Sequence, residues 1–387
     1  MKVGFVLPAL QKPSGWRSYA LGLIGELLDK VEGVLFVPQE EAAAAQQEFP
    51  HLGVVPIAAT QNASLQSPSG ALRLWQTWRS IRSLKVSLDL VHSLEAYPTG
   101  LVGHWLAKQC HCPHILTAHG TYGVIWITSF FDRILYRRVL ASAARLCPVS
   151  QATARRIEQT FGQALKHVPI DVILNGNAYY QRVPDEIAQT RRLPSRPTLL
   201  SVGEVKPRKG YHISLQVFER LQKELPEVRY DIVGNCPDNA YTHRLRESIR
   251  QKGLAGVRLH GTVSEAELAG FYRQASLFLL TPQEDAGLQK YVFEGFGLVY
   301  LEAGAYGLPV IASRCGGVSE AVRHGETGFV FAQDDVDGMA QAALRLLTDE
   351  ALNRRMGLAN RRWAETLTWK RCAEQFWSIY QRCVEGK

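Results

Sequence analysis

The stretch FEGFGLVYLEAGAYGLPVIASRCGG, residues 293–317, is the part of the chain that decides the fold. Two glycines precede an apolar helical run, which stops at a glycine followed by proline, and a short apolar strand comes next. This order predicts a helix over 297–306 and a strand over 309–313, as in an α/β protein. Glu294 would precede the helix and Glu302 would lie inside it, although the stretch is otherwise suited to burial.

Short apolar runs alternate with longer helical patterns along the chain, which is typical of helices layered on parallel sheets. In the first half we predict strands at residues 2–7, 34–37, 54–57, 89–93, 114–118, 145–149 and 168–174. In the second half we predict strands at residues 198–203, 228–234, 257–261, 276–281, 309–313 and 328–331. Helices are expected between the strands, and the tail is predicted to form three more at 335–348, 350–364 and 369–385.

A chain of 387 residues is longer than one hydrophobic core usually organises, so we expect two domains. The polar segment 178–195 contains prolines and is the best candidate for a linker. It would separate an N-terminal domain, residues 1–177, from a C-terminal domain, residues 196–368. When two doubly wound domains face each other, the carboxyl ends of both sheets border one interdomain cleft, where such folds bind ligands.

The composition is that of an ordinary globular protein, with 46% hydrophobic and 21% charged residues. No apolar run reaches the length of a membrane-spanning helix, and the apolar start of the chain is too short for a signal peptide. Seven scattered cysteines fit a reducing compartment better than a disulfide framework, so we expect an intracellular protein. The cluster HWLAKQCHCPH, residues 104–114, repeats no zinc spacing and is more simply explained by packing.

The net charge of +8 is concentrated in two stretches that also carry aromatic residues. One is ALRLWQTWRSIRSLK, residues 71–85, in a region without any acid between Glu48 and Asp89, and the other is TYGVIWITSFFDRILYRRV, residues 121–139. Helices of this kind can lie on an anionic membrane or attract an anionic acceptor. Alternatively, their aromatic rings face the core and only their arginines face water. No nucleic-acid-binding motif accompanies the charge, so we expect no nucleic acid partner.

Glycine-containing turns offer places where a phosphate could bind or a ligand could approach closely. SVGEVKPRKG ends a strand and opens a helix beside Lys209. The free N–H groups at the start of the 297–306 helix form a second anion site, and carboxylates such as Glu294 and Glu302 accept hydrogen bonds from paired sugar hydroxyls. A Pro-Ser-Gly turn ends at Gly15, but it is not a dinucleotide fingerprint.

Taken together, these motifs resemble those of a known family. The pattern of a glutamate, seven residues and a second glutamate, followed by AGAYGLPVIASRCGGVSEAVRHGETGF, resembles the family-4 retaining glycosyltransferases of the GT-B fold. SVGEVKPRKG, DIVGN, VRLHGTVSEAELAGFYRQASLFLLTP, TAHG, PVS and ILNGN follow in the family's order and spacing, so the likeness covers nearly the whole chain. It implies two Rossmann-like domains facing a cleft, with the C-terminal helix, about residues 369–387, crossing back to the N-terminal domain.

The resemblance also implies roles for individual residues. Glu302 would bind the ribose hydroxyls of the nucleotide, and Glu294 would contact the donor sugar near its reacting face. Lys209 would neutralise the diphosphate leaving group, and His119 would lie close to the reaction centre, so these two and Glu294 are the catalytic candidates. The other implied binding positions are Phe296, Gly297 and Leu298 around the diphosphate and sugar, Val263 beside the base, and Gly15 beneath the diphosphate.

By this resemblance the chain would be a retaining hexosyltransferase that needs neither a metal nor a cofactor, because a lysine and a helix start can stabilise the leaving diphosphate. We expect a UDP-sugar donor, with UDP-glucose first and GDP-mannose as the alternative. The acceptor would be a saccharide or a polyprenyl-linked saccharide, in polysaccharide or glycoconjugate biosynthesis. The enzyme would be cytoplasmic and would make a peripheral contact with the inner face of the membrane.

Two features depart from the family's pattern. Glu204 stands where an arginine usually follows the glycine of the phosphate loop, so it must turn away or be compensated by Lys206 or Arg208. In addition, QEDAGLQKYVF, residues 283–293, lengthens the loop beside the donor sugar. Two other functions stay open: an epimerase or phosphorylase of the same fold, and a non-catalytic sugar-nucleotide-binding protein, for which Glu204 is the only support.

Overall fold

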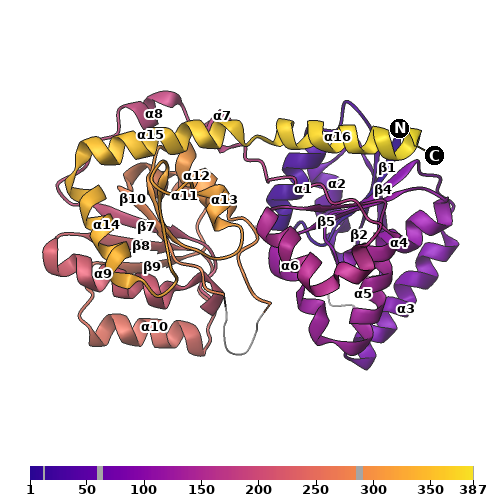
Figure 1. The fold of residues 1–387 in the computed structure, drawn as a ribbon, viewed down its shortest axis with the longest axis horizontal. Helices are drawn as coiled ribbons and strands as arrows, with labels where there is room; N and C mark the ends of the chain where they lie inside the picture. The colour runs from indigo at the N-terminus through magenta and orange to yellow at the C-terminus, as the bar shows by residue number, and fades with distance from the viewer. Residues whose placement is uncertain (12–13, 59–63, 285–290, 387) are drawn as a thin grey trace. The chain divides into compact units, whose positions relative to one another are not determined.

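The computed structural model describes residues 1–11, 14–58, 64–284 and 291–386. The chain separates into two compact units, Met1–Gly176 with Thr368–Lys387, and Asn177–Leu367. Each unit contains one six-stranded sheet in which every paired neighbour is parallel, with helices around it (Figure 1). The parallel α/β architecture that the sequence predicts is therefore confirmed in both units.

The sheet of the first unit has the strand order β3-β2-β1-β4-β5-β6. Its strands are β1 (Lys2–Val6), β2 (Glu32–Pro38), β3 (Gly53–Ile57), β4 (Leu90–Ser93), β5 (His114–Ala118) and β6 (Arg145–Pro148). Because β4 and β5 are buried at every position, they appear in the sequence as continuous apolar runs rather than alternating ones. The chain runs outward from β1 to β3 and then returns to β4, so the topological switch point lies between β1 and β4.

Helices of the first unit begin at capping residues that the sequence supplies. Ser14, Ser67, Ser129 and Ser150 each accept a backbone N–H bond at the start of a helix. The helices are α1 (Gly15–Gly25), α2 (Ala42–Glu48), α3 (Pro68–Ser83), α4 (Thr99–Cys110), α5 (Phe130–Ser142) and α6 (Gln151–Phe161).

The last helix of the chain, α16 (Trp369–Glu385), belongs to the first unit. It buries Trp369, Phe376 and Tyr380, and it packs against α1. The Tyr380 hydroxyl lies 2.6 Å from Nδ1 of His92 in β4, so the C-terminal helix contributes to the core of a sheet encoded by the first half of the sequence.

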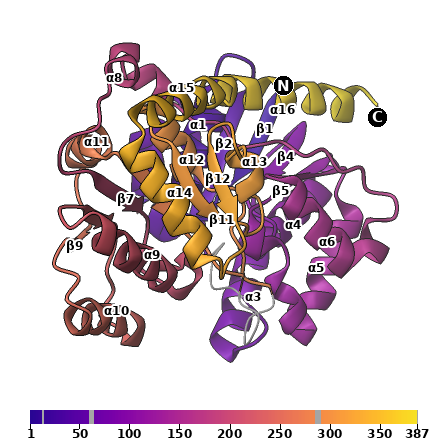
Figure 2. The same ribbon diagram turned by 60° about the vertical axis from the view of Figure 1, so that its left-hand side comes forward.

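The sheet of the second unit has the order β12-β11-β10-β7-β8-β9. Its strands are β7 (Thr198–Val202), β8 (Arg229–Val233), β9 (Val257–Gly261), β10 (Leu277–Leu280), β11 (Val310–Ser313) and β12 (Gly328–Phe331). Its longer helices are α9 (Tyr211–Glu224), α10 (Ala240–Gln251), α11 (Glu265–Gln274), α12 (Leu298–Ala305), α14 (Val336–Thr348) and α15 (Glu350–Thr366), and α13 (Val318–Ala321) is a single turn. α15 packs on α12, and α14 packs on α9 (Figure 2).

Two segments differ from the predictions. Residues 168–174 are not a strand of the sheet: they run beside β6 with one isolated bridge, between Leu146 and Ile170. Pro148 and Pro169 have no N–H group, which prevents a regular ladder there. Residues 178–195 contain two short helices, α7 (Tyr179–Arg182) and α8 (Asp185–Gln189), and belong to the second unit rather than forming a free linker.

Side chains that no local pattern predicts hold that segment in place. Arg361 of α15 donates to the Tyr180 carbonyl over 2.9 Å and to the Asp185 carboxylate over 2.5 Å. Arg191 donates to the backbone carbonyls of Tyr272, Ala275 and Tyr306. Because the guanidinium groups satisfy carbonyls at several helix and loop ends, the polar composition of this segment reflects hydrogen bonding and not flexibility.

Candidate functional site

The candidate site of the second unit lies at the switch point of its sheet, between β7 and β10. The chain leaves the carboxyl end of β7 through the short helix η5 (Pro207–Lys209) and enters α9. It leaves β10 through a loop and returns at Glu294, just before α12. Segments 85 residues apart in the sequence therefore meet at one edge of the sheet.

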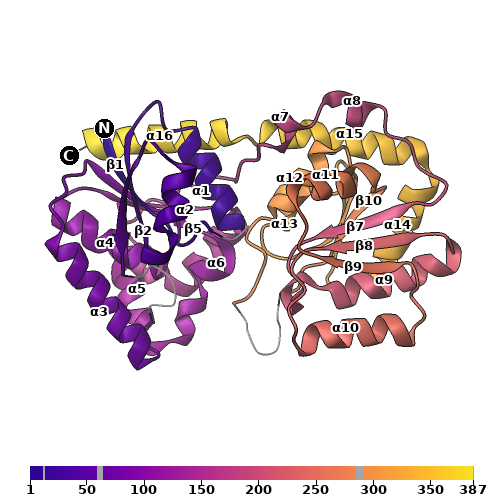
Figure 3. The ribbon, with the colours of Figure 1, turned by 180° about the vertical axis from the view of Figure 1, so that it is seen from behind.

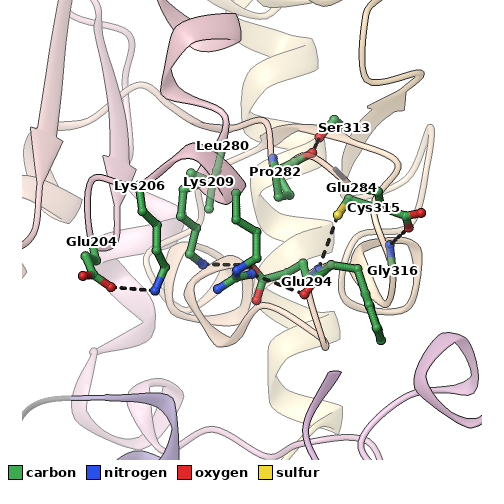
Figure 4. A network of polar contacts seen from close by, with 12 residues as sticks. Glu204, Lys206, Lys209, Leu280, Pro282, Glu284, Glu294, Ser313, Cys315 and Gly316 are labelled. Atoms are coloured by element: carbon green, nitrogen blue, oxygen red, sulfur yellow. Dashed lines mark hydrogen bonds and ion pairs between the residues drawn. The ribbon is translucent and has the colours of Figure 1, made fainter. Parts of the chain in front are cut away.

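Glu294 forms the centre of the site by accepting from two cations. Nη1 of Arg208 lies 2.6 Å and Nζ of Lys209 lies 2.8 Å from the same oxygen, Oε2 of Glu294 (Figure 4). The Glu294 and Lys209 side chains are 11% and 12% exposed, and Arg208 is 21% exposed. One buried carboxylate thus faces two positive charges, which leaves a local excess of positive charge.

The electrostatics of the cluster follow from this arrangement. Burial alone would raise the pKa of Glu294, but Arg208 and Lys209 outweigh it and lower the pKa to about 2. Burial lowers the pKa of Lys209, and Glu294 opposes that effect. The carboxylate is therefore ionised across the physiological pH range and is already engaged by two charge-assisted bonds.

The turn of residues 315–317 holds the backbone of Glu294. The Gly317 N–H donates to the Glu294 carbonyl over 2.9 Å, and the Glu294 N–H donates to Sγ of Cys315 over 3.3 Å. Gly316 has φ +52°, and a Cβ built there would lie 2.1 Å from the Glu294 carbonyl oxygen, so only glycine fits. The Gly316 N–H also donates to Glu284 over 2.8 Å (Figure 4). The sequence CGG is therefore what positions the carboxylate.

Glu204 does not reach the cations at Glu294. Its carboxylate pairs with Nζ of Lys206 at 2.6 Å, and both side chains are more than a third exposed (Figure 4). Of the alternatives that the sequence left open, compensation by Lys206 is the one observed, while Arg208 serves Glu294. Residues 285–290 of the extended loop lie outside the described residues.

The start of α12 has the geometry of an anion site. Gly297 adopts φ +93°, and a Cβ there would lie 2.5 Å from the ring of Tyr300, so a glycine is required before the helix. Phe296 is 2% exposed and fixes the turn in the core, and Leu298 is the first helical residue. No acidic side chain occupies the first turn, and the Tyr300 N–H donates to the Gly297 carbonyl over 3.1 Å, so an anion would bind at the N–H groups that precede Tyr300.

Glu302 lies one turn inside α12 and faces aromatic hydroxyls. The Tyr272 hydroxyl donates to Oε2 of Glu302 over 2.8 Å. Burial raises the pKa of Glu302 to about 7, against the opposing effects of Tyr272 and Lys209. Glu302 is in turn the largest cause of the raised pKa of Tyr179. This carboxyl group is therefore poised to accept hydrogen bonds from a ligand in place of Tyr272.

The remaining predicted residues lie elsewhere. Val263 follows the carboxyl end of β9, two strands away from β7 along the same edge of the second sheet. Gly15 and His119 belong to the first unit, at the carboxyl ends of β1 and β5 on either side of β4. A Cβ built at Gly15 would meet no atom within 4 Å, so the space beside this glycine is open.

The His119 ring is available for a ligand. Its Nε2 atom is buried and has no hydrogen-bond partner within the described parts of the chain. Burial lowers the pKa of His119 to about 3, opposed by a hydrogen bond with the backbone of Leu94. The ring is thus neutral, and Tyr19 packs edge-on against it with ring centroids 4.5 Å apart.

Beside His119 lies a carboxyl group that the sequence did not suggest. Oε2 of Glu95 accepts from Nε1 of Trp16 over 2.8 Å, and Oε1 accepts from the Ala96 N–H over 2.7 Å. The His119 N–H reaches Oε1 over 3.4 Å. Glu95 is 2% exposed, and burial raises its pKa to about 8. It connects the loops after β1, β4 and β5 around the switch point of the first unit.

No metal centre is formed by the residues that the structure describes, since no three His, Cys, Asp or Glu side chains are grouped to hold an ion. In the 104–114 cluster, Nδ1 of His104 lies 2.7 Å from the Ser142 hydroxyl, and Nε2 of His114 lies 2.8 Å from the Ser93 hydroxyl. The Cys110 thiol donates to the Val86 carbonyl. These hydrogen bonds join the cluster to α5, to β4 and to the segment before β4.

Arg208, Tyr272 and Glu95 are the residues that sequence reasoning did not assign to the site. Arg208 adjoins Lys209, so the run PRKG already indicated a cation at this turn. Its contact with Glu294 could not be predicted, because the two residues are 86 positions apart in the sequence. Tyr272 and Glu95 carry no local signal, because each gains its role from a contact across the fold.

Two family models match this chain. "Glycosyl transferases group 1" matches residues 183–363, and "Glycosyltransferase Family 4" matches residues 13–177. Among curated proteins, the GDP-mannose-dependent alpha-(1-6)-phosphatidylinositol monomannoside mannosyltransferase of Mycolicibacterium smegmatis is 30% identical over 359 residues, which are 90% of each chain.

Solved structures share the arrangement of strands and helices. HepE of Anabaena, in complex with UDP and glucose, has a TM-score of 0.73 at 20% identity, over 98% of this chain and 99% of that chain. Sucrose-phosphate synthase of Thermosynechococcus elongatus has a TM-score of 0.77 at 20% identity, over 100% of this chain and 99% of that chain. At this level of identity, both likenesses concern the fold.

Proposed function

This chain belongs to the family-4, group 1 glycosyltransferases of the GT-B fold, and on that premise we propose that it transfers a hexosyl group from a nucleoside diphosphate sugar to an acceptor hydroxyl. The observation that supports this most is the convergence of Arg208, Lys209 and the start of α12 at the switch point of the second unit. A leaving diphosphate gains negative charge as the anomeric C–O bond breaks. Two partly buried cations and the N–H groups at a helix start stabilise such charge electrostatically.

In the proposed reaction the configuration at the anomeric carbon is retained. The leaving phosphate oxygen accepts the proton of the attacking acceptor hydroxyl, on the same face of the sugar. In this route Glu294 is not a nucleophile, because the acceptor hydroxyl attacks the anomeric carbon directly. The role of Glu294 is to hold Arg208 and Lys209 in place and to accept from hydroxyls of the donor sugar.

The other candidate residues receive binding roles in this proposal. Glu302 accepts from the ribose hydroxyls, Val263 lies beside the base, and Phe296, Gly297 and Leu298 present backbone N–H groups. In the first unit, the unpartnered Nε2 atom of His119 bonds to a sugar hydroxyl, and the open space at Gly15 admits the diphosphate. No metal is required, because protein cations already face the leaving group.

The relatives bear on the choice of donor. The mannosyltransferase of M. smegmatis, with 90% of each chain aligned, is named for its use of GDP-mannose, and this supports GDP-mannose as the first donor to test. UDP-glucose, which the sequence resemblance favoured, is the second. The acceptor in that relative's name is a glycosylated lipid, so we propose a lipid-linked saccharide as the acceptor and the inner face of the cytoplasmic membrane as the place of action.

Release of nucleoside diphosphate with each donor tests this function. The purified protein is incubated with GDP-mannose or UDP-glucose and a lipid-linked saccharide extract, with and without EDTA. We expect one donor to release its diphosphate in an acceptor-dependent and EDTA-insensitive reaction, and the product's anomeric proton to show the donor's configuration by NMR. Binding of a nucleotide without turnover on any acceptor would instead favour the non-catalytic alternative, whose sequence support weakens because Lys206 neutralises Glu204.

A further inference from the structure

Exposed hydrophobic side chains of the first unit gather on two helices. Of the eight large hydrophobic residues that are exposed in the described structure, six lie on α3 and α5. We name them, with the cations between them, the basic aromatic face; its apolar members are Leu72, Trp75, Trp78, Phe130, Phe131 and Ile134. Phe130 and Phe131 are 61% and 60% exposed, and Trp75 is 50% exposed. The alternative in which these rings face the core is therefore wrong for both helices.

The two helices are joined where they begin. The Ser64 hydroxyl and the Leu65 N–H, just before α3, donate to the carboxylate of Asp132 in the first turn of α5 over 2.6 and 3.0 Å. Figures 1 and 3 show the beginnings of α3 and α5 side by side, from opposite directions. The two helices that carry these apolar residues therefore meet at their first turns.

Arginines accompany the exposed rings. The guanidinium carbon of Arg79 lies 5.5 Å from the Trp75 ring centroid, that of Arg82 lies 4.9 Å from Trp78, and that of Arg133 lies 5.5 Å from Phe130. Three further basic residues of the face are exposed: Arg73, Arg137 and Arg138. The only acid on either helix is Asp132, which is 0% exposed.

These charges are not neutralised within the described residues. No ion pair joins any of the six arginines to a described carboxylate, whereas eleven other arginines form such pairs: Arg17, Arg145, Arg182, Arg192, Arg196, Arg208, Arg220, Arg250, Arg323, Arg361 and Arg382. Aromatic rings flanked by unpaired cations fit the headgroup region of a bilayer, where rings reach the acyl boundary and guanidinium groups meet lipid phosphates.

We propose that the basic aromatic face binds the surface of an anionic lipid bilayer. The inference rests on the proposed function, because it makes the acceptor a molecule of that bilayer. α3 and α5 both begin at the carboxyl edge of the first sheet, the edge that carries His119 and Gly15. A membrane docked at this face lies beside the part of the first unit that is assigned to the reaction centre.

Sedimentation with lipid vesicles tests the face directly. The full chain is mixed with vesicles of phosphatidylcholine alone, or of phosphatidylcholine with phosphatidylglycerol, at low and at high salt. We expect binding only to the anionic vesicles and weaker binding at high salt. Combining Trp75→Ser with Trp78→Ser should weaken binding at least about tenfold, because apolar area is lost from the interface.

The charge contribution has a matched control. Arg137 and Arg138 are adjacent and exposed on α5, as Arg354 and Arg355 are on α15. Replacing the first pair by alanine should weaken vesicle binding about fivefold for each arginine removed. Replacing Arg354 and Arg355 by alanine should leave vesicle binding within about twofold, because that pair lies on the second unit and outside the face.

Several outcomes would overturn the proposal. They are the absence of binding to anionic vesicles by a cooperatively folded protein, equal weakening by the two arginine pairs, and a concentration-dependent dimer in sedimentation velocity that the tryptophan variant abolishes. The last would show that a second copy covers the face. Nucleotide-induced thermal stabilisation, measured on the same variants, separates this failure from failure of the proposed function, because the nucleotide residues lie in the second unit.

Discussion

At the scale of single residues, the side chain that organises the site is Glu294. A buried carboxylate is costly unless it is paired, and here one oxygen accepts from two cations that are themselves largely buried. Such a cluster of buried charges adds little stability compared with apolar packing. Removing one of the three charged groups, however, leaves the others without their electrostatic partner. The stability of the second unit and its ability to bind an anion therefore depend on the same three side chains.

Glu294→Gln should destabilise the protein by about 3 kcal/mol, because Arg208 and Lys209 would remain buried without a counter-charge. Glu204→Gln is the matched control, since Glu204 also pairs with a lysine but in an exposed position. Its cost should stay below about 1 kcal/mol. Urea unfolding followed by circular dichroism measures both. Equal costs would show that the Glu294 cluster is an ordinary surface ion pair.

Glu302 predicts a pH dependence of stability. Burial raises its pKa from 4.5 to about 7, so between these values the unfolded chain releases the proton while the folded chain keeps it. The contribution of Glu302 to the free energy of unfolding therefore falls as pH rises from 4.5 to about 7, and it is constant outside this window. Glu302→Gln cannot ionise and removes this loss.

The Tm of the Glu302→Gln variant, relative to the unaltered protein, should consequently rise across the same window and then level off. Differential scanning calorimetry at a series of pH values, without nucleotide, provides the measurement. A Tm difference that does not change with pH would mean that Glu302 ionises equally in both states and is not desolvated by α12 and Tyr272.

At the scale of elements, the start of α12 depends on the conformation of one glycine. Gly297→Ala would place a Cβ 2.5 Å from the Tyr300 ring at φ +93°, so we expect a loss of about 2 kcal/mol in stability. Gly270→Ala, in the middle of α11 with nothing within 4 Å of its Cβ, should instead stabilise by about 0.5–1 kcal/mol.

Thermal unfolding of the two alanine variants compares them. We expect the two stability changes to have opposite signs. Because both substitutions add the same methyl group, this difference would arise from the backbone conformation and surroundings of each glycine. If Gly297→Ala were neutral, the left-handed turn would not be what opens the N–H groups of α12, and the proposed diphosphate site would lose its geometric basis.

Most elements of the fold could be predicted because their signals are local. Strands such as β10 and β11 are continuous apolar runs between polar turns, and helices such as α14 begin and end close to the predicted residues. The prediction failed where backbone chemistry overrode composition: residues 168–174 are β-branched and apolar, yet Pro148 and Pro169 interrupt their pairing.

The candidate site was predictable to a lesser degree, because only part of it is encoded locally. The spacing of Glu294 and Glu302 and the turns around Gly297 and Lys209 pointed to residues that the structure places at one edge of the second sheet. Which cation would pair with which carboxylate depends on contacts more than 80 residues apart, and the contact of Tyr272 with Glu302 spans 30 residues. The exposure of the aromatic rings on α3 and α5 likewise follows from tertiary packing, because both orientations fit the same sequence.

At the scale of the whole molecule, the last helix of the chain completes the first unit. Phe376 is 0% exposed and lies beside the ring of His92, with ring centroids 4.7 Å apart. Phe376→Ala should lower the stability of the first unit by about 3–5 kcal/mol, because it leaves a cavity in a close-packed core. Nucleotide binding by the second unit should be unchanged at temperatures where both units are folded.

Guanidinium unfolding tests this prediction if the two units are followed separately. An extrinsic fluorescent label at an exposed position of each unit reports its unfolding transition. The transition of the first unit should move to lower denaturant while that of the second stays, because the substituted core belongs to one unit. Movement of both transitions by the same amount would show that the units unfold as one cooperative body.

The central claim is that the second unit binds a nucleoside diphosphate through Lys209, and isothermal titration calorimetry tests it most directly. GDP, UDP and ADP are titrated, with and without magnesium, into the unaltered protein, Lys209→Ala and the control Lys252→Ala, an exposed lysine that also pairs with a glutamate. We predict that one nucleotide binds independently of magnesium, at least about tenfold more weakly to Lys209→Ala, and within about twofold of normal to Lys252→Ala. Absence of binding by all three nucleotides, or equal weakening in both variants, would contradict the claim.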